Sequence, residues 1–202
     1  MRLLIMGPPG SGKGTQAVLL AARHHVPAIS TGDIFRANVA AQTPLGRVAR
    51  EYMDAGEYVP DRVTNAMVRD RLGLPDCATG FLLDGYPRTL DQVDELDVVL
   101  GEAGTALDAV VELVVDQDVL IDRLLLRARS ERRLDDTAEV IRRRQEVYQD
   151  QTAPLTARYD ELGLLRTVDG HGQVELVAAR VAGTLEHLSA NPAARRSAGS
   201  TI

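Results

Sequence analysis

The chain has 202 residues, of which 45% are hydrophobic, so it can bury one sizeable core. Its net charge of -6 argues against a polyanionic partner such as nucleic acid, so we expect any anion to bind in a local cationic pocket. No apolar run approaches the roughly 20 residues that cross a bilayer, and the single cysteine excludes an internal disulfide and a thiolate zinc cluster, which together predict a soluble, cytoplasmic protein with no membrane partner.

Short apolar runs typical of strands alternate with helical patterns along the chain. The strand-like runs are 3–6, 26–29, 81–83, 110–115 and 164–168, and the helical patterns are 13–24, 33–41, 45–55, 61–73, 89–103, 117–128, 137–162 and 173–188. This alternation predicts an α/β fold of three layers, in which helices cover both faces of a central, five-stranded, mostly parallel sheet.

Two excursions interrupt the predicted core. Residues of about 30–60 form a helical insertion between two strands, and residues of about 126–136 form a short polar segment between two helices. Both are candidates for moving flaps. Residues 1–188 are predicted to form a single domain, and 189–202, which lack hydrophobic periodicity, a disordered tail.

A glycine-rich loop follows the first strand. Residues 7–15 read Gly-Pro-Pro-Gly-Ser-Gly-Lys-Gly-Thr, and Lys13 is the only lysine of the chain. The pattern is that of the phosphate-binding loop G-x-x-x-x-G-K-[ST], except that Gly14 follows the lysine and the hydroxyl comes at Thr15. With 17 glycines in 202 residues, two glycines fall at the required distances from the lysine by chance in about 0.7 per cent of cases. We therefore interpret the loop as a phosphate site rather than a plain turn.

A second motif, Asp84-Gly85-Tyr86-Pro87-Arg88, follows the apolar run 81–83. The carboxyl ends of parallel strands meet at one edge of a sheet, so we expect Asp84 to face the glycine loop. A carboxylate at the end of a buried strand is costly unless it serves a cation, a water molecule or a hydrogen-bond network. Asp84 is therefore a candidate to hold Mg²⁺ through water, and the alternative is an ordinary cap of the following turn.

Together the two motifs resemble those of the adenylate kinase family. Similar segments elsewhere are Ser30-Thr31-Gly32-Asp33 with Arg36, Gly56-Glu57-Tyr58-Val59-Pro60, Gln92, Arg133-Leu134-Asp135-Asp136, Arg144 and Thr152-Ala153-Pro154-Leu155. The resemblance covers most of residues 1–188 and implies a P-loop fold with a helical flap for a nucleoside monophosphate and a short lid. It also implies a monomer that transfers the terminal phosphoryl group of Mg·ATP reversibly to AMP, giving two ADP, in adenine nucleotide homeostasis.

The resemblance assigns roles to residues of both nucleotide sites. The implied ATP-binding residues are Gly10, Ser11, Gly12, Lys13, Gly14, Thr15, Arg127 over the adenine and ribose, and Gly172 at the base. The implied AMP-binding residues are Thr31, Arg36, Glu57, Tyr58, Val59, Gly85, Tyr86, Pro87, Arg88, Gln92, Arg133 and Arg144, with Arg36 and Arg88 on the phosphate and Thr31 and Gln92 on the adenine. The implied catalytic residues are Lys13, Arg88, Arg133 and Arg144, the last two closing over the transferring group.

The lid segment is short and contains no cysteine or histidine, so we expect no zinc and no metal other than Mg²⁺. It departs from the family pattern at Arg132, where relatives usually carry glycine. Asp135 and Asp136 either pair with arginines at the hinge or cap the next helix, and the sequence leaves both alternatives open.

The sequence leaves two alternatives to the adenylate kinase interpretation. A UMP/CMP kinase uses similar loops, although Thr31 and Gln92 match the adenine-recognising version. A nucleotide-binding switch that does not transfer phosphate would not need a second set of phosphate-binding arginines, which the resemblance places at Arg36, Arg88, Arg133 and Arg144.

Overall fold

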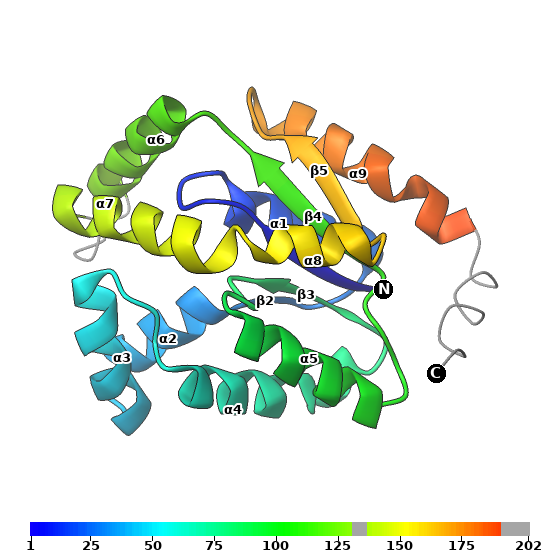
Figure 1. Cartoon of the computed structure of the whole chain (residues 1–202), viewed down its shortest axis with the longest axis horizontal. Coiled ribbons are helices and arrows are strands. Elements are labelled where there is room, and N and C mark those ends of the chain that lie inside the picture. The colour runs from blue at the N-terminus through cyan, green and yellow to red at the C-terminus, as the bar shows by residue number, and fades with distance from the viewer. Residues whose placement is uncertain (131–136, 191–202) are drawn as a thin grey trace.

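The computed structural model describes residues 1–130 and 137–190, which form an α/β fold around a parallel sheet (Figure 1). The strands are β1 (Arg2–Met6), β2 (Ala28–Ser30), β3 (Phe81–Asp84), β4 (Ala109–Val114) and β5 (Leu165–Asp169). The order across the sheet is β2-β3-β1-β4-β5, and all neighbouring pairs are parallel. The predicted fold class is therefore confirmed, and each strand-like run of the sequence overlaps a strand.

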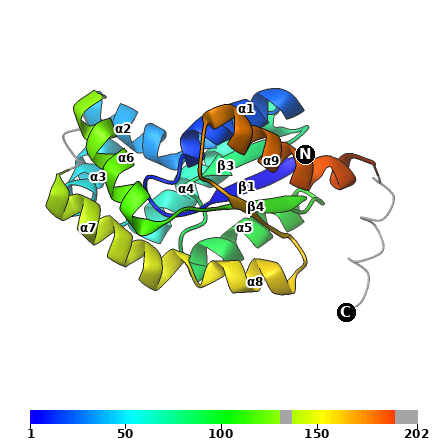
Figure 2. The same cartoon turned by 90° about the horizontal axis from the view of Figure 1, so that it is seen from above.

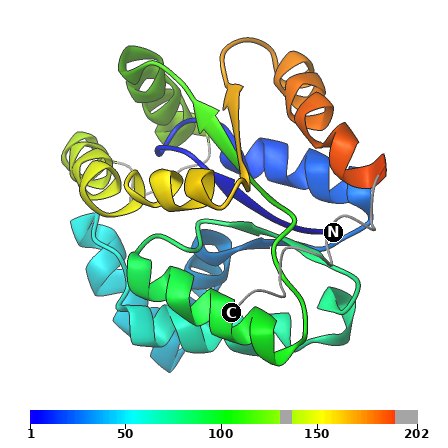
Figure 3. The same ribbon diagram turned by 45° about the vertical axis from the view of Figure 1, so that its right-hand side comes forward.

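Helices cover both faces of this sheet (Figures 2 and 3). On one face lie α1 (Lys13–His24) and α9 (Val174–Ala190), and on the other lie α4 (Asp61–Leu72), α5 (Leu90–Glu102) and α8 (Leu155–Glu161). A 3₁₀ turn, η1 (Pro75–Cys77), precedes β3. The three layers follow from strands that are apolar on both faces, as the continuous runs of the sequence predicted.

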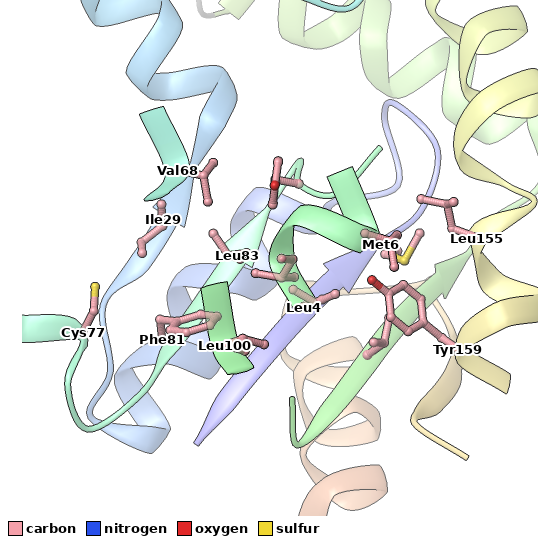
Figure 4. Packing of buried hydrophobic residues seen from close by; sticks show 14 residues of the cluster. Leu4, Met6, Ile29, Val68, Cys77, Phe81, Leu83, Leu100, Leu155 and Tyr159 are labelled. Atoms are coloured by element: carbon pink, nitrogen blue, oxygen red, sulfur yellow. The ribbon is translucent and has the colours of Figure 1, made fainter. Parts of the chain in front are cut away.

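Alternate residues of the central strand enter two separate cores. Leu4 and Met6 of β1 pack with Leu83, Leu155 and Tyr159 in the cluster that Figure 4 shows. Leu3 and Ile5 point to the opposite face, against α1 and α9. Because successive side chains of a strand point in opposite directions, one fully buried strand ties both layers together.

The helices of the first excursion and the helices that flank the second extend from the same side of the sheet (Figure 1). The first excursion consists of α2 (Thr31–Ala40) and α3 (Pro44–Ala55), which pack around Phe35, Ala49 and Val59 in a small cluster of their own. The other, about 126–136, lies mostly outside the described residues, and α6 (Gln117–Ser130) and α7 (Ala138–Val147) flank it. Helix α2 begins two residues earlier than predicted because the Ser30 hydroxyl caps it, accepting a hydrogen bond from Asp33 N at 3.2 Å.

The predicted single helix 137–162 is wrong, because the structure divides it. Helix α7 ends at Val147, a π-helical turn η2 (Tyr148–Thr152) follows, and α8 begins at Leu155. Pro154 has no N–H to continue the helical ladder and its ring clashes with the preceding turn, so the helix is interrupted there. The Ala153 N–H instead donates to Tyr148 O at 2.9 Å, a spacing of five residues. At the other end of the chain, α9 extends to Ala190, two residues into the predicted tail, and 191–202 lie outside the described residues.

Candidate active site

A cavity of about 770 Å³ lies at the carboxyl edge of β1 and β3. The glycine loop borders it on one side, the α2–α3 excursion on another, and the segment that follows β3 on a third. Helix α6 contributes Arg123 and α7 contributes Arg144. The chain thus places its ligand-sized cavity where parallel sheets commonly bind nucleotides, as the two sequence motifs predicted.

The glycine loop wraps around the start of α1. Gly12 caps this helix in a left-handed conformation, with φ of 92°, and as a glycine it contributes no side-chain capping hydrogen bond. Gly10 also has positive φ, and a Cβ there would lie 2.8 Å from Leu120 O, so only glycine fits. The positive end of α1 therefore faces the cavity, an arrangement that favours phosphate.

Lys13 sits within this loop and borders the cavity. Its ammonium donates to Pro8 O at 2.9 Å, which holds the side chain back along the loop. Gly10, Gly12, Gly14 and Thr15 border the same cavity. Ser11 does not, being 2% exposed, and its hydroxyl oxygen has no hydrogen-bond partner among the described residues.

Asp84 ends β3 directly opposite the first turn of α1. A Cβ on Gly14 would lie only 3.6 Å from Asp84 Oδ2, and both residues border the cavity. Burial raises the pKa of Asp84 above its ordinary value, although the charges of Lys13 and Arg88 act in the opposite direction. Removal from water therefore destabilises the ionised form of this carboxyl group, and a cation in the cavity would offset that effect.

Arg88 is held from three directions. Its Nε donates to Gly85 O at 2.7 Å, which also accepts from the Thr31 hydroxyl at 2.9 Å. The guanidinium lies over the ring of Tyr58, 4.8 Å from the centroid. The Arg88 carbonyl accepts from the Thr152 hydroxyl at 2.9 Å. A cation that is stacked and hydrogen-bonded before a ligand arrives is pre-organised for phosphate.

Tyr58 and Thr152 connect the α2–α3 side of the cavity to η2. The two hydroxyl oxygens lie 2.8 Å apart. Since the single proton of Thr152 goes to the Arg88 carbonyl, the Tyr58 hydroxyl is the donor in this pair. The resemblance had placed Tyr58 in the AMP site and Thr152 in a family-like segment, but it did not predict the contact between their hydroxyl groups.

The remaining predicted AMP-site residues converge on the same cavity. These include Thr31, Arg36, Glu57, Tyr58, Val59, Gly85, Tyr86, Pro87, Arg88 and Gln92, together with Arg144 of α7. Arg36 forms an ion pair with Asp33 at 2.5 Å on the same helix. Tyr86 is buried, and its hydroxyl donates to Asn65 at 3.0 Å, so it packs below the cavity as well as lining it.

Several of the residues singled out from the sequence are not brought into this cavity by the described part of the chain. Arg133, Arg132, Asp135 and Asp136 lie outside the described residues, and Arg127 lies in α6 with its side chain also outside them. Gly172 is described, in a turn with φ of 103°, but does not border the cavity. The turn before it is held by Arg180, which donates to His171 O at 2.6 Å.

Sequence reasoning missed Arg123. Its guanidinium donates to Ser11 O at 3.5 Å and to Gly170 O at 3.2 Å, so it bridges the glycine loop and the turn after β5. Arg123 stands four residues before Arg127, one turn away on the same helix face, and that spacing was the available signal.

Comparison with known proteins agrees with this geometry. The family model described as adenylate kinase matches residues 5–164. The adenylate kinase of Nocardioides sp. is 61% identical over 181 residues, covering 90% of this chain and 95% of that protein. Those of Kocuria rhizophila and Nocardia farcinica are 56% and 55% identical, covering 92% and 89% of this chain and 98% and 96% of theirs. With its phosphate loop, its opposing arginines and these relatives, the chain belongs to the adenylate kinase family.

Proposed function

We propose that the chain is an enzyme that transfers the terminal phosphoryl group of Mg·ATP reversibly to AMP, giving two ADP. The observation that carries this proposal is one cavity bordered both by the lysine of a phosphate loop and by a second group of arginines, Arg36, Arg88 and Arg144. A protein that only bound a nucleotide would need the first set of cations but not the second.

At the donor site, Gly10, Gly12, Gly14 and Thr15 bind the ATP phosphates through the loop backbone and the start of α1. Ser11 contributes through its backbone, because its side chain is buried beneath the loop. Lys13 stabilises the charge that moves between the outer phosphates. Arg127 and the backbone of Gly172 are proposed for the adenine and ribose, and Arg123 helps to hold the adjoining turn in place.

At the acceptor site, Arg36 and Arg88 bind the AMP phosphate, and Thr31, Gln92 and the backbone of residues 57–59 bind the adenine. The cavity wall between the phosphate-binding and adenine-binding residues is formed by Gly85, Tyr86 and Pro87. Arg133 and Arg144 close over the transferring group, also contacting AMP. Phosphoryl transfer requires little covalent catalysis by the protein, so the protein contributes mainly by positioning the substrates and neutralising their charge.

The residues around Asp84 fit a magnesium ion. Mg²⁺ prefers oxygen ligands and keeps several of its waters, and Asp84 and Thr15 present a carboxylate and a hydroxyl to the cavity. When bound, Mg²⁺ would neutralise charge on the phosphate oxygens. We propose that Asp84 holds it through water, and that no zinc takes part.

We further propose that the enzyme acts as a cytoplasmic monomer on small nucleotides, with no nucleic-acid or membrane partner. Residues of about 30–60 then serve as the AMP-binding flap and those of about 126–136 as the lid of one domain, 1–188. Among the described residues, no helix combines the length and apolar character that crossing a membrane requires.

A coupled assay with Mg·ATP and AMP, CMP, UMP or GMP tests the proposal. We expect rapid turnover with AMP and much slower turnover with the other three acceptors. Faster turnover with UMP or CMP would instead make the chain a pyrimidine monophosphate kinase. ATP binding without turnover on any acceptor would support the nucleotide-binding switch.

A further inference from the structure

Gln92 is a buried side chain whose amide is fully oriented by its neighbours. It is 1% exposed, borders the cavity, and lies in the first turn of α5. Its Oε1 accepts from the Arg88 N–H at 2.8 Å, and its Nε2 donates to Asp61 Oδ1 at 2.6 Å. Both amide atoms are therefore engaged by protein groups at the edge of the proposed acceptor site.

The chemistry of the two partners fixes which amide atom is which. A backbone N–H can only donate, so its partner at Arg88 must be the amide oxygen. An ionised carboxylate can only accept, so its partner at Asp61 must be the amide nitrogen. Turning the amide over would break both hydrogen bonds. The amide nitrogen would then face the Arg88 N–H, donor against donor, and the amide oxygen would face the Asp61 carboxylate, acceptor against acceptor. The orientation of Gln92 thus follows from its surroundings.

The Asp61 carboxylate is fixed in place because both of its oxygens accept hydrogen bonds. It lies in the first turn of α4, and its second oxygen, Oδ2, accepts from the Thr89 hydroxyl at 2.6 Å. That hydroxyl also caps α5, accepting from the Gln92 N–H at 3.2 Å. Two helix starts are therefore joined by one carboxylate, and Asp61 cannot turn away from Gln92 without breaking a second bond.

We infer that Asp61 is a positioning residue for base selection: it holds the Gln92 amide in the orientation that accepts adenine and rejects a 6-oxopurine. The inference rests on the proposed contact between Gln92 and the AMP base. Gln92 has one lone pair on Oε1 and one hydrogen on Nε2 left over from its contacts with Arg88 and Asp61.

Adenine matches that remaining pattern. Its 6-amino group donates to the amide oxygen, and N1 accepts from the amide nitrogen, a bidentate pairing of the same kind as the one that glutamine makes with N6 and N7 of adenine in DNA. A 6-oxopurine presents an oxygen where the amino group stood, so two acceptors face each other. Only an overturned amide would accommodate this base on its N1 edge, and Asp61 opposes that movement.

The test compares AMP with IMP, whose base differs from adenine in carrying an oxygen at position 6 and a hydrogen on N1. With saturating Mg·ATP, kcat/KM for each acceptor is measured for the unmodified enzyme, Asp61→Ala and Asp61→Asn. We expect Asp61→Ala to lower the preference for AMP over IMP by about tenfold, the scale of one amide–base pairing. Asp61→Asn, whose oxygen can still accept from Gln92, should keep most of the preference.

Asp91→Ala is the matched control. Asp91 is an exposed carboxylate in the first turn of α5, so its removal changes charge at a neighbouring helix start. The control should leave the AMP to IMP ratio unchanged. If Asp61→Ala fails to fold, Asp61→Ser keeps a residue that helix starts favour while shortening the reach to Gln92, and the ratio should shift in the same direction.

A double substitution shows whether Asp61 acts through Gln92. In a Gln92→Leu background, Asp61→Ala should leave the AMP to IMP ratio unchanged, because the group that it orients is gone. Equal losses for both acceptors in Asp61→Ala alone, or a ratio that still shifts in the Gln92→Leu background, would overturn the inference. An unmodified enzyme that does not use AMP would instead overturn the proposed function.

Discussion

At the scale of single residues, Lys13 is the one lysine in a chain whose other basic side chains, apart from histidine, are all arginines. Its ammonium lies within the loop and bonds to the Pro8 carbonyl, a position that suits a compact cation. A planar guanidinium is broader and would need a wider passage. The geometry explains why a chain that otherwise uses arginine keeps a lysine here.

Lys13→Met should reduce kcat by about 10²–10³-fold, because the lost charge matters most when charge moves between the phosphates. The affinity for ATP should fall much less. Steady-state kinetics with varied ATP, together with equilibrium binding of ATP, separates the two effects. Lys13→Arg serves as the control that keeps the charge and changes the shape, and it should recover little activity. Parallel losses of kcat and ATP affinity would limit Lys13 to binding the ground state.

At the scale of elements, the loop between α3 and α4 docks against α7 and η2. Glu57 pairs with Arg143 of α7 at 2.7 Å, and Tyr58 donates to Thr152 of η2. Gly56 has φ of 75°, and a Cβ there would lie 3.1 Å from Val140 O. The ion pair is half-exposed and worth little alone, so the tyrosine provides the more specific link.

Tyr58→Phe should lower the free energy of unfolding by about 1 kcal/mol, the usual contribution of one such hydrogen bond. It keeps the ring over Arg88, so the KM for AMP should change little. Tyr58→Leu removes the ring as well and should raise the KM for AMP while leaving that for ATP unchanged. Chemical denaturation and steady-state kinetics measure the two effects.

Tyr52→Phe is the matched control, since Tyr52 is a partly buried tyrosine of the α2–α3 cluster. It should leave the KM for AMP unchanged. A KM for AMP that rises equally in Tyr58→Phe and Tyr58→Leu would mean that the hydroxyl, and not the ring, positions Arg88.

The sequence predicted most of these elements because their signals are local. Apolar strands and helix-capping residues can be recognised in the sequence alone. Because parallel strands end at one edge of the sheet, the sequence also predicted that Lys13 and Asp84 lie near each other. The break at Pro154 was missed because an apolar helical pattern continues on both sides of it. The partners of Gln92 and the reach of Arg123 depend on packing between distant segments, which no single-sequence pattern reports.

At the scale of the whole molecule, the burial of Asp84 beside the cavity affects the stability of the folded protein. Burial raises the pKa of Asp84, so the folded protein binds this proton more tightly than the unfolded chain does. The carboxylate is neutral in both states at low pH, and its ionisation weakens the folded state as pH rises through the folded-state pKa. At neutral pH, burial of this carboxyl group therefore lowers the stability of the folded protein.

Asp84→Asn should consequently unfold at a higher temperature than the unmodified enzyme at neutral pH, by about 2–4 °C for each kcal/mol relieved. The gain should shrink as pH falls toward the ordinary pKa of aspartate, and activity should be lost. Thermal unfolding between pH 4 and pH 8 without nucleotide measures the difference. A lower melting temperature at neutral pH would show that attraction to Lys13 and Arg88 outweighs the cost of burial.

The solitary lysine of the glycine loop also gives the molecule a natural chemical reporter. Lys13 carries the only lysine amine of the sequence, and the α-amino group of Met1 donates to Thr79 O at 3.2 Å. An amine-reactive label that acylates Lys13 would therefore add its mass at the glycine loop. The rate of labelling at Lys13, followed by mass spectrometry of the peptide that contains it, would report nucleotide occupancy without any engineered tag.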